Sequence, residues 1–246
     1  MSREGNDIDV SIVIPCYQEE DHLIENAGEI VRIMNGTKYS FEIIFVDDKS
    51  TDSTKDKILE IEKARSNVRH IFHEINSGKG KSIAAGAGIA KGKFIGHIDI
   101  DLEVSAEYIP ALLLELEKGN DIVLIKRKVK FGLNPKFIIR DVAGMIHRKA
   151  VRLFLGIPQI DVQSGCKFFR REALLPLLEK TKSPGWFFDV EIMTLAYVNG
   201  FRIKQIPGYY IRNKKKKSTV KLVEDGWQQF KNLVRFSGEI KKKKST

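Results

Sequence analysis

FIGHIDIDLE, residues 94–103, joins a short apolar strand to three acidic residues placed two apart. Alternate residues of an extended chain point the same way, so Asp99, Asp101 and Glu103 converge if the extended form continues to Glu103. Three adjacent carboxylates repel one another unless a cation lies among them, and oxygen ligands suit Mg2+ or Mn2+. The pattern predicts a metal site that holds a diphosphate where the strand ends. A solvated acidic turn has the same composition, and this segment alone does not separate the two.

Other polar clusters follow predicted strands in the same way. Apolar runs at 10–14, 41–46, 68–72 and 94–98 alternate with helical patterns at 23–34, 52–61 and 79–91. Such repeats predict an α/β fold with a mostly parallel sheet, helices on both faces and ligands at the carboxyl ends of the strands. The clusters that fall at those ends are YQEE (17–20), DD (47–48), NSGKG (76–80) and the acidic stretch. This coincidence is the strongest evidence for a binding site that the residues give by themselves.

The second half of the chain is less regular. Helices are expected at 108–116, 135–155 and 187–198, and strands at 121–125 and 201–207. The segments 135–155 and 219–240 are amphipathic with basic faces, whereas Lys241–Lys244 are expected to be disordered. No repeat or linker divides the chain. We expect one α/β domain over residues 1–212, followed by a basic amphipathic helix and tail over residues 213–246.

Composition favours a soluble globular protein. The chain has 246 residues, 42% hydrophobic and 30% charged, which is enough to bury a full core. No apolar run approaches the roughly 20 residues that span a bilayer, and the polar start does not resemble a secretory signal. Cys16 and Cys166 have no metal-ligand spacing and form no disulfide framework. These features predict a reducing, cytoplasmic location.

Charge is concentrated near the C-terminus. The net charge is +10, and residues 212–246 contain 12 Lys and Arg against 3 Asp and Glu. The body of the chain is therefore close to neutral. A basic tail of this kind predicts an anionic surface as partner, either a membrane or a nucleic acid.

The strand-end clusters suggest how a nucleotide is held. Asp47 and Asp48 offer acceptors for a base edge or for ribose hydroxyls, although helix capping by Ser50 or Asp52 accounts for part of this segment. The NSGKG turn opens a helix, where backbone amides and Lys79 favour an anion. It lacks the spacing of a P-loop. The five histidines form no metal pattern, and no nucleophilic triad is visible, which argues against nucleophilic hydrolysis.

Several motifs together resemble the GT-A glycosyltransferases of family 2, most closely the polyprenyl-phosphate (dolichyl-phosphate) mannose and glucose synthases. VIPCYQEE (13–20) is similar to the opening P-x-Y-N-E motif, with Gln18 for Asn. DDKSTD (47–52) resembles D-D-G-S-x-D, with Lys49 for Gly, and DIDLE (99–103) resembles D-x-D-L-Q, with Glu103 for Gln. NSGKG (76–80) matches N-x-G-K-G. DVQSGCKFFRR (161–171) and GWFFDVE (185–191) extend the similarity, which covers about residues 8–222.

The resemblance implies a Rossmann-like GT-A fold and metal-dependent, inverting transfer of one sugar from a GDP-mannose or UDP-glucose type donor to dolichyl or polyprenyl phosphate. The processive Q-x-x-R-W motif is absent, which favours a single transfer. The implied nucleotide-binding residues are Pro15, Tyr17, Glu19, Asp47, Asp48, Lys79 and Asp99. The implied metal ligands, for Mg2+ or Mn2+, are Asp99, Asp101 and Glu103. The implied catalytic residues are Asp101, Arg127, Arg140 and Asp189, and Arg127, Arg140 and Arg212 would meet the acceptor phosphate or diphosphate.

Two classes of alternative stay open at this point. A phosphate acceptor is already ionised and needs no general base, whereas a hydroxyl of a glycan, protein or small molecule would use Asp189 or Glu191 as base. A non-catalytic nucleotide- or nucleic-acid-binding protein would explain the basic tail, but the acidic triad argues against it. We therefore expect a lipid acceptor, no nucleic acid, and a peripheral position on the cytoplasmic face of a membrane, with the two amphipathic segments in the interface.

Overall fold

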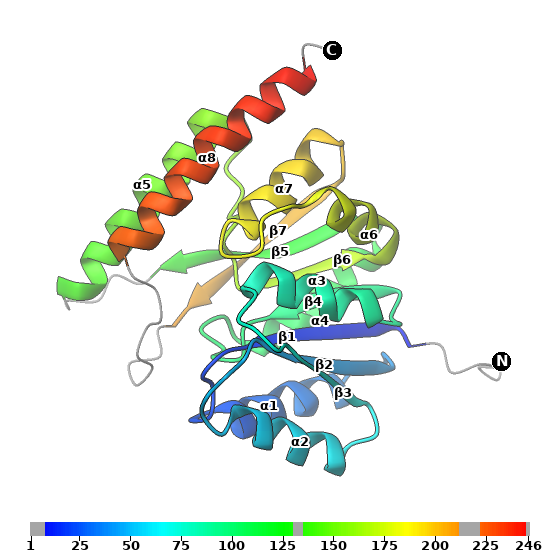
Figure 1. Cartoon of the computed structure of the whole chain (residues 1–246). Helices are drawn as coiled ribbons and strands as arrows, with labels where there is room; N and C mark the ends of the chain where they lie inside the picture. The colour runs from blue at the N-terminus through cyan, green and yellow to red at the C-terminus, as the bar shows by residue number, and fades with distance from the viewer. Residues whose placement is uncertain (1–7, 130–134, 212–221, 245–246) are drawn as a thin grey trace.

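The chain alternates strands and helices through its first half and ends in a long helix (Figure 1). The computed structural model describes residues 8–129, 135–211 and 222–244. The elements are β1 (Val10–Cys16), α1 (Leu23–Asn35), β2 (Phe41–Asp47), α2 (Thr54–Ala64), β3 (Val68–Phe72), α3 (Lys79–Ile89), β4 (Phe94–Ile98), the 3-10 helix η1 (Ala106–Tyr108), α4 (Ile109–Glu117), β5 (Ile122–Val129), α5 (Pro135–Leu155), β6 (Cys166–Arg170), α6 (Arg171–Lys180), α7 (Phe188–Val198), β7 (Ile203–Tyr210) and α8 (Leu222–Lys244).

The strands form one sheet in the order β3-β2-β1-β4-β6-β5-β7. Its neighbours are parallel except where β6 pairs antiparallel with β4 and with β5. The predicted mostly parallel α/β sheet is confirmed. The strand β6 was missed, because five residues of apolar sequence do not reveal a partner that lies far away in the chain: Cys166 pairs with Ile98, and Phe169 pairs with Ile122.

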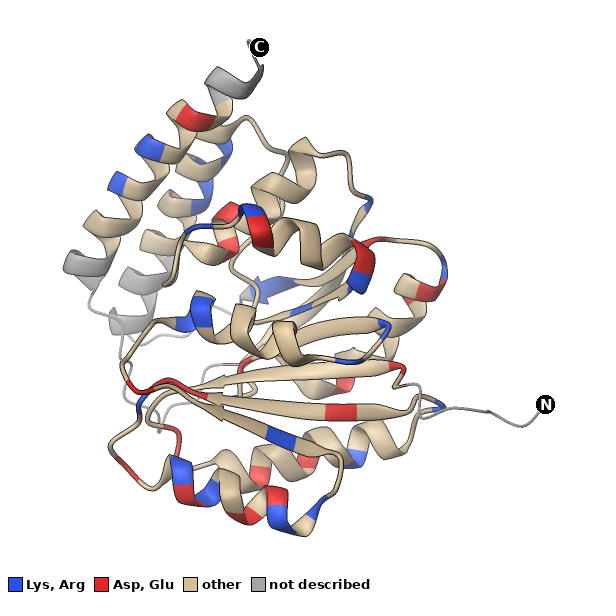
Figure 2. Ribbon diagram, turned by 45° about the vertical axis from the view of Figure 1, so that its right-hand side comes forward, with Lys and Arg blue, Asp and Glu red and all other residues tan. Residues whose placement is uncertain are grey.

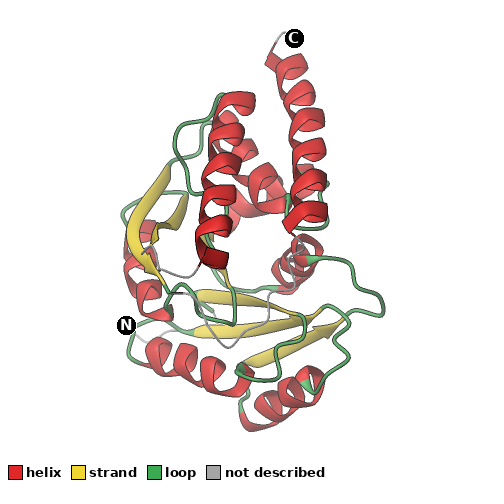
Figure 3. Ribbon diagram, turned by 90° about the vertical axis from the view of Figure 1, so that its left-hand side faces the viewer, coloured by secondary structure: helices red, strands yellow, loops and turns green. Residues whose placement is uncertain are grey.

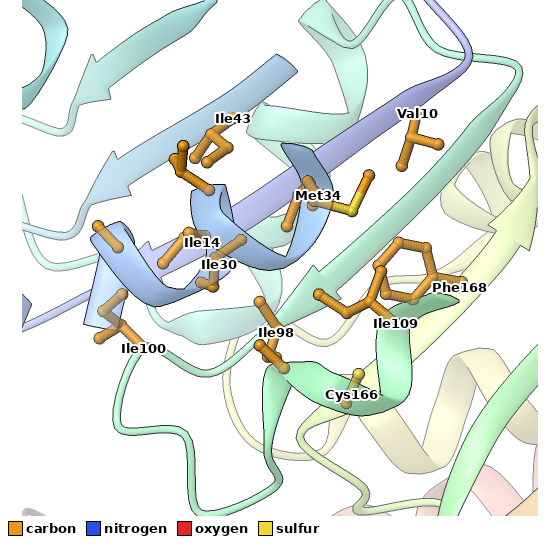
Figure 4. Packing of buried hydrophobic residues seen from close by; sticks show 14 of the residues in the cluster. Val10, Ile14, Ile30, Met34, Ile43, Ile98, Ile100, Ile109, Cys166 and Phe168 are labelled. Carbon is orange, nitrogen blue, oxygen red and sulfur yellow. The ribbon is translucent and has the colours of Figure 1, made fainter. Parts of the chain in front are cut away.

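Helices cover both faces of the sheet, as the alternation of side chains along a strand requires. On β1, Ile12 belongs to the cluster formed with α1, α2 and α4, whereas Val13 belongs to the cluster formed with α3, α6 and α7. Figure 4 shows part of the first cluster, where Ile30 and Met34 of α1 lie over the strands. Helices therefore cover both faces of the sheet, which leaves the ends of the strands as the place where a polar ligand can bind.

The helices α5 and α8 pack side by side, beyond the β5–β7 part of the sheet (Figures 1 and 3). The Phe154 ring meets the Phe230 ring edge-on at 5.9 Å between centroids, and the Ser237 hydroxyl donates to the Phe154 carbonyl at 2.7 Å. Leu233, Phe236 and Ile240 of α8 are buried. The pair is thus a structural part of the molecule.

Two predicted boundaries differ from the structure. The helix α8 continues through Lys241–Lys244, so the expected disorder there is wrong. The strand β7 runs to Tyr210 rather than stopping at Pro207, because it stays paired with β5 as far as Val129. In the described parts of the chain, no helix combines the length and apolar character needed to cross a membrane.

Candidate active site

Three loops at the carboxyl edge of the sheet contain left-handed residues that are not glycine. Gln18 follows β1 with φ 59°, Lys49 follows β2 with φ 66°, and Leu102 follows β4 with φ 48°. Side chains disfavour this region because Cβ crowds the backbone, and such strain collects at functional sites. Two of these positions are those where the sequence departs from the resembled motifs, Gln18 for Asn and Lys49 for Gly. Asn and Gly adopt a positive φ most easily.

The loops after β1 and β2 are joined by hydrogen bonds. The Gln18 side-chain oxygen accepts from the backbone N–H of Thr51 at 3.1 Å and of Asp52 at 3.2 Å. The Gln18 N–H donates to the Ser50 hydroxyl at 2.9 Å. Of the residues expected to hold a nucleotide here, Tyr17 is exposed, Pro15 is half-buried, and Glu19 is buried with a carboxylate oxygen 2.8 Å from the His22 ring.

Asp48 shapes the glycine-rich turn. Its two carboxylate oxygens accept from the backbone N–H groups of Ser77 and Gly78, each at 2.7 Å, and the His73 ring lies 2.9 Å away. Asp47 differs, since one of its buried oxygens accepts from Ser50 N–H at 3.2 Å while the other has no hydrogen-bond partner. A buried acceptor without a partner calls for a ligand or water. Of these two aspartates, Asp47 is therefore the one with a carboxylate oxygen that accepts no hydrogen bond within the protein.

The glycines of the turn are required by packing. A Cβ on Gly78, whose φ is +91°, would lie 2.8 Å from the carbonyl oxygen of Pro184, and a Cβ on Gly80 would lie 2.5 Å from Phe188. The Lys81 N–H donates to the Pro184 carbonyl at 2.9 Å. The start of α3 is thus clamped against the loop 181–187, a contact that the sequence did not indicate.

Behind the turn lies a network of alternating charges, in which Lys167 and Asp189 are buried and Lys79 and Asp99 are partly exposed. Lys79 Nζ is 2.6 Å from Asp99 Oδ1 and 4.0 Å from Asp189, and Lys167 Nζ is 2.6 Å from Asp189. Burial lowers the pKa of Lys79, but attraction to Asp99 and Asp189 outweighs it and raises that pKa. For Lys167, burial prevails over Asp189 and lowers the pKa. Burial, followed by the charges of Lys167 and Lys79, lowers the pKa of His97, which keeps the ring neutral in the core.

The predicted convergence of three carboxylates does not occur. The strand β4 ends at Ile98, and the turn at Leu102 breaks the alternation that the prediction assumed. Asp99 faces Lys79, and Glu103 accepts a short hydrogen bond from the Tyr210 hydroxyl. No group of three acidic, His or Cys side chains suited to a metal ion occurs among the described residues. The donor set still fits Mg2+ or Mn2+, because such ions often use one or two carboxylates together with substrate phosphates.

The arginines expected at the acceptor phosphate have different environments. Arg127 forms a two-point ion pair with Asp161, at 2.9 Å from Nε and 2.8 Å from NH2, and its guanidinium carbon lies 5.5 Å from the Tyr210 ring centroid. Burial would lower the pKa of Arg127, but the bonds and charge of Asp161 raise it. Arg140 lies on α5 where the structure does not describe side chains, and Arg212 lies outside the described residues. Asp161 thus holds Arg127 in place, and a role for Arg127 at the acceptor phosphate stays a prediction.

Asp189 and Glu191, the candidate bases, are buried at 4% and 3% exposure. Asp189 is ion-paired with Lys167, as described above. Glu191 accepts from the backbone N–H groups of Lys182 at 3.0 Å and Ser183 at 2.8 Å. Sequence reasoning missed Lys167 and Trp186 as parts of the site, although both lie inside motifs that it quoted.

These features define a GT-A-like fold with its polar site at the carboxyl edge of the sheet. Comparison with known families matches residues 11–177 to glycosyl transferase family 2. The chain belongs to this family, and it is a glycosyltransferase.

Similar proteins agree with this assignment. The chain is 28% identical over 207 residues to Glycosyltransferase AglD of Haloferax volcanii, covering 81% of this chain and 32% of that protein. It is 28% identical over 228 residues to the dolichyl-phosphate beta-glucosyltransferase of Saccharomyces cerevisiae, covering 83% of this chain and 67% of that protein. This chain thus spans about a third of the first relative and two thirds of the second. A glucosyl-3-phosphoglycerate synthase from Mycobacterium tuberculosis has a similar fold, with a TM-score of 0.70 at 19% identity, covering 94% of this chain and 80% of that one.

Proposed function

We propose that this glycosyltransferase moves one sugar from a nucleotide-diphosphate sugar, of the GDP-mannose or UDP-glucose type, to dolichyl or polyprenyl phosphate, with inversion at the anomeric carbon. The motifs that follow β1, β2 and β4 support a nucleotide donor. The yeast relative, named a dolichyl-phosphate beta-glucosyltransferase, supports the lipid phosphate acceptor. The first experiment described below would identify the particular sugar and base.

In this proposal, different residues along the carboxyl edge of the sheet bind different parts of the donor. The unpartnered oxygen of Asp47 suits an N–H of the base, while Asp48 sets the turn whose helix start favours the diphosphate. Asp99 and Asp101, together with phosphate oxygens, would hold Mg2+ or Mn2+. When bound, the ion supplies Lewis-acid stabilisation of the charge that grows on the leaving diphosphate. Lys79 adds a fixed positive charge beside Asp99.

One observation favours a phosphate over a hydroxyl acceptor. A hydroxyl needs a general base, and Asp189 is poorly suited to be one because its carboxylate is buried and lies 2.6 Å from the ammonium of Lys167. The Lys167 ammonium donates a hydrogen bond to this carboxylate, so one of its oxygens is already occupied. Glu191 is occupied by two backbone N–H groups. An acceptor that is already an anion removes the need for either residue.

We place the enzyme at the cytoplasmic face of a membrane, where a polyprenyl phosphate presents its head group. The Lys and Arg residues of α5 and α8 (Figure 2) and the basic sequence of residues 213–246 would favour anionic lipid, at about 1 kcal/mol for each charge near the surface. In this proposal residues 213–246 form a membrane-binding segment, of which α8 packs against α5 of the catalytic domain. Lys214–Lys217 lie outside the described residues and enter as sequence only.

The test is nucleotide release from a panel of UDP- and GDP-sugars with Mg2+ or Mn2+, with and without a polyprenyl phosphate. Release that needs the lipid, the metal and Asp101 is expected. Asp101→Asn should reduce it by at least about 100-fold because charge stabilisation in the transition state is lost. Asp56→Asn, an exposed change on α2, is the matched control. Donor binding without lipid-dependent release would reject the lipid acceptor, and an absence of donor binding would reject the proposed reaction altogether.

A further inference from the structure

We propose that the Trp186 indole is the stacking platform for the sugar ring of the donor, and thus a residue that determines sugar binding. The inference rests on the proposed function insofar as it takes the donor to be a nucleotide-diphosphate sugar. It assigns a role to the loop 181–187, which joins α6 to α7 and which none of the nucleotide motifs includes.

Trp186 is exposed where its neighbours are buried. It has 45% of its surface exposed, whereas Phe187 and Phe188 have 2% and 3%. Its ring centroid lies 5.4 Å from Lys79 Nζ, and that ammonium lies 2.6 Å from Asp99. The indole therefore stands next to the end of β4, where the diphosphate is expected, with much of its surface open to a ligand.

The loop that presents Trp186 is held firmly. Glu191 binds its first part through the N–H groups of Lys182 and Ser183, and the Pro184 carbonyl accepts from Lys81 N–H at 2.9 Å. Gly78 and Gly80 have no room for a side chain because this loop and α7 lie against them. A platform fixed before the ligand arrives loses little conformational entropy on binding.

The chemistry of an indole argues against the phosphates, and its position points to the sugar rather than to the base. An indole carries no positive charge for a phosphate, but it offers an apolar face to ring C–H groups and an N–H to a hydroxyl. Contacts along the edge run from Asp48 on the β2 side, through the turn and Lys79, to Asp99 and Asp189. With the nucleoside at the loops of β1 and β2, the next group beyond the diphosphate on this path is the hexose.

The experiment compares two ligands on each variant by calorimetric titration in the presence of Mg2+: the nucleoside diphosphate and its hexose derivative (UDP with UDP-glucose, GDP with GDP-mannose). Trp186→Ala should weaken binding of the nucleotide sugar by about tenfold and change binding of the diphosphate less than about twofold. Trp186→Phe should recover much of the loss. Tyr197→Ala, which removes another exposed aromatic ring from α7, should change neither affinity.

A second measurement keeps the indole in place. The chain has 2 tryptophans, so Trp227→Phe leaves Trp186 as the single emitter. Its fluorescence should change on adding the nucleotide sugar and change much less with the diphosphate alone. Equal responses to the two ligands, or equal losses of both affinities in Trp186→Ala, would overturn the platform while leaving a nucleotide-binding enzyme. Loss of affinity for the lipid phosphate alone would assign Trp186 to the acceptor. A wild-type protein that binds no nucleotide would overturn this inference and the proposed function together.

Discussion

Lys49 has a backbone conformation that is unfavourable for a residue with a side chain. It occupies a left-handed conformation, φ 66°, in the loop between β2 and α2, and its side chain is exposed. A non-glycine residue in this region costs about 1 kcal/mol because Cβ approaches the carbonyl oxygen. Glycine avoids this cost, although it loses more backbone entropy on folding.

We therefore expect Lys49→Gly to raise the free energy of unfolding by about 0.5 kcal/mol, as measured by urea denaturation. Lys63→Gly is the matched control, since the same change in the exposed last turn of α2 should lower stability by up to about 1 kcal/mol. Loss of stability in both variants would contradict strain at Lys49.

The buried pair of Arg127 and Asp161 predicts a pH dependence. Burial alone would raise the pKa of Asp161, but hydrogen bonds from Arg127 and its charge lower that pKa below its usual value. The stabilisation from the carboxylate is complete above its unfolded pKa of about 3.9, and it is lost as pH falls from there through the lower folded value.

Asp161→Asn should cost about 3 kcal/mol at pH 7, because it leaves the guanidinium of Arg127 without its counter-charge. Below about pH 4 the difference from wild type should shrink. Urea denaturation between pH 3 and pH 7 measures both effects, with Asp56→Asn as the exposed control. Stability curves that stay parallel down to pH 3 would argue that the pair contributes nothing through ionisation.

At the level of elements, the loop between α6 and α7 depends on one side chain of α7. Glu191 reaches back from the first turn of the helix to the N–H groups of Lys182 and Ser183. These N–H groups would otherwise lack partners in a partly buried segment, at a cost of about 1–3 kcal/mol each. The position of Trp186, and of the Pro184 carbonyl against α3, is therefore set by Glu191.

Glu191→Gln should accelerate amide hydrogen exchange at Lys182 and Ser183, because the amide nitrogen cannot accept a hydrogen bond. In calorimetry it should also weaken binding of the nucleotide sugar several-fold more than binding of the diphosphate. Glu179→Gln, exposed on α6, provides the control. Unchanged exchange at both amides would show that Glu191 does not hold the loop.

At the level of the whole molecule, α5 has two apolar faces. Val151 and Leu155 are buried, while Val142, Ile146 and Leu153 point the other way, with Leu153 71% and Ile146 65% exposed. Spacings of four and seven residues place these three on one side of the helix. The neighbouring α8 adds Trp227, which is 60% exposed, and residues 142–155 contain basic but no acidic side chains. A basic, apolar outer surface of this kind suits the interface of an anionic bilayer.

We expect Ile146→Glu and Leu153→Glu each to weaken sedimentation with phosphatidylserine–phosphatidylcholine vesicles by about tenfold or more, since each apolar side chain contributes about 1.5–3 kcal/mol when buried. Higher salt should weaken binding of the wild type. Ile24→Glu, an exposed apolar position on α1, is the control. If all three variants bound vesicles as the wild type does, membrane docking through α5 and α8 would be refuted, whereas the transferase activity would stand.

Local patterns predicted much of the fold and brought the polar clusters of the candidate site to one edge of the sheet. The apolar runs of β1 to β4, the helices between them and the clusters at the strand ends depend on neighbours in the sequence, and all these elements occur as expected. The roles of individual residues were harder to predict. Three carboxylates placed two residues apart lie on one side of the chain only while the strand continues. The turn at Leu102 interrupts the extended conformation. The antiparallel strand β6 and the contact of Pro184 with Gly78 join distant segments, which no local pattern reveals.

The sequence by itself therefore determined the class of fold, the family and the edge of the sheet where the candidate site lies, because periodicity and short motifs are local properties. The tertiary structure alone decided which polar groups are paired within the protein and which are left available to a ligand. It ties Asp48 to the turn, Arg127 to Asp161, Glu103 to Tyr210 and Asp189 to Lys167. Burial strengthens each of these pairings, since a charged or polar group removed from water needs a partner. Those partners come from strands and loops that only the folded chain brings together.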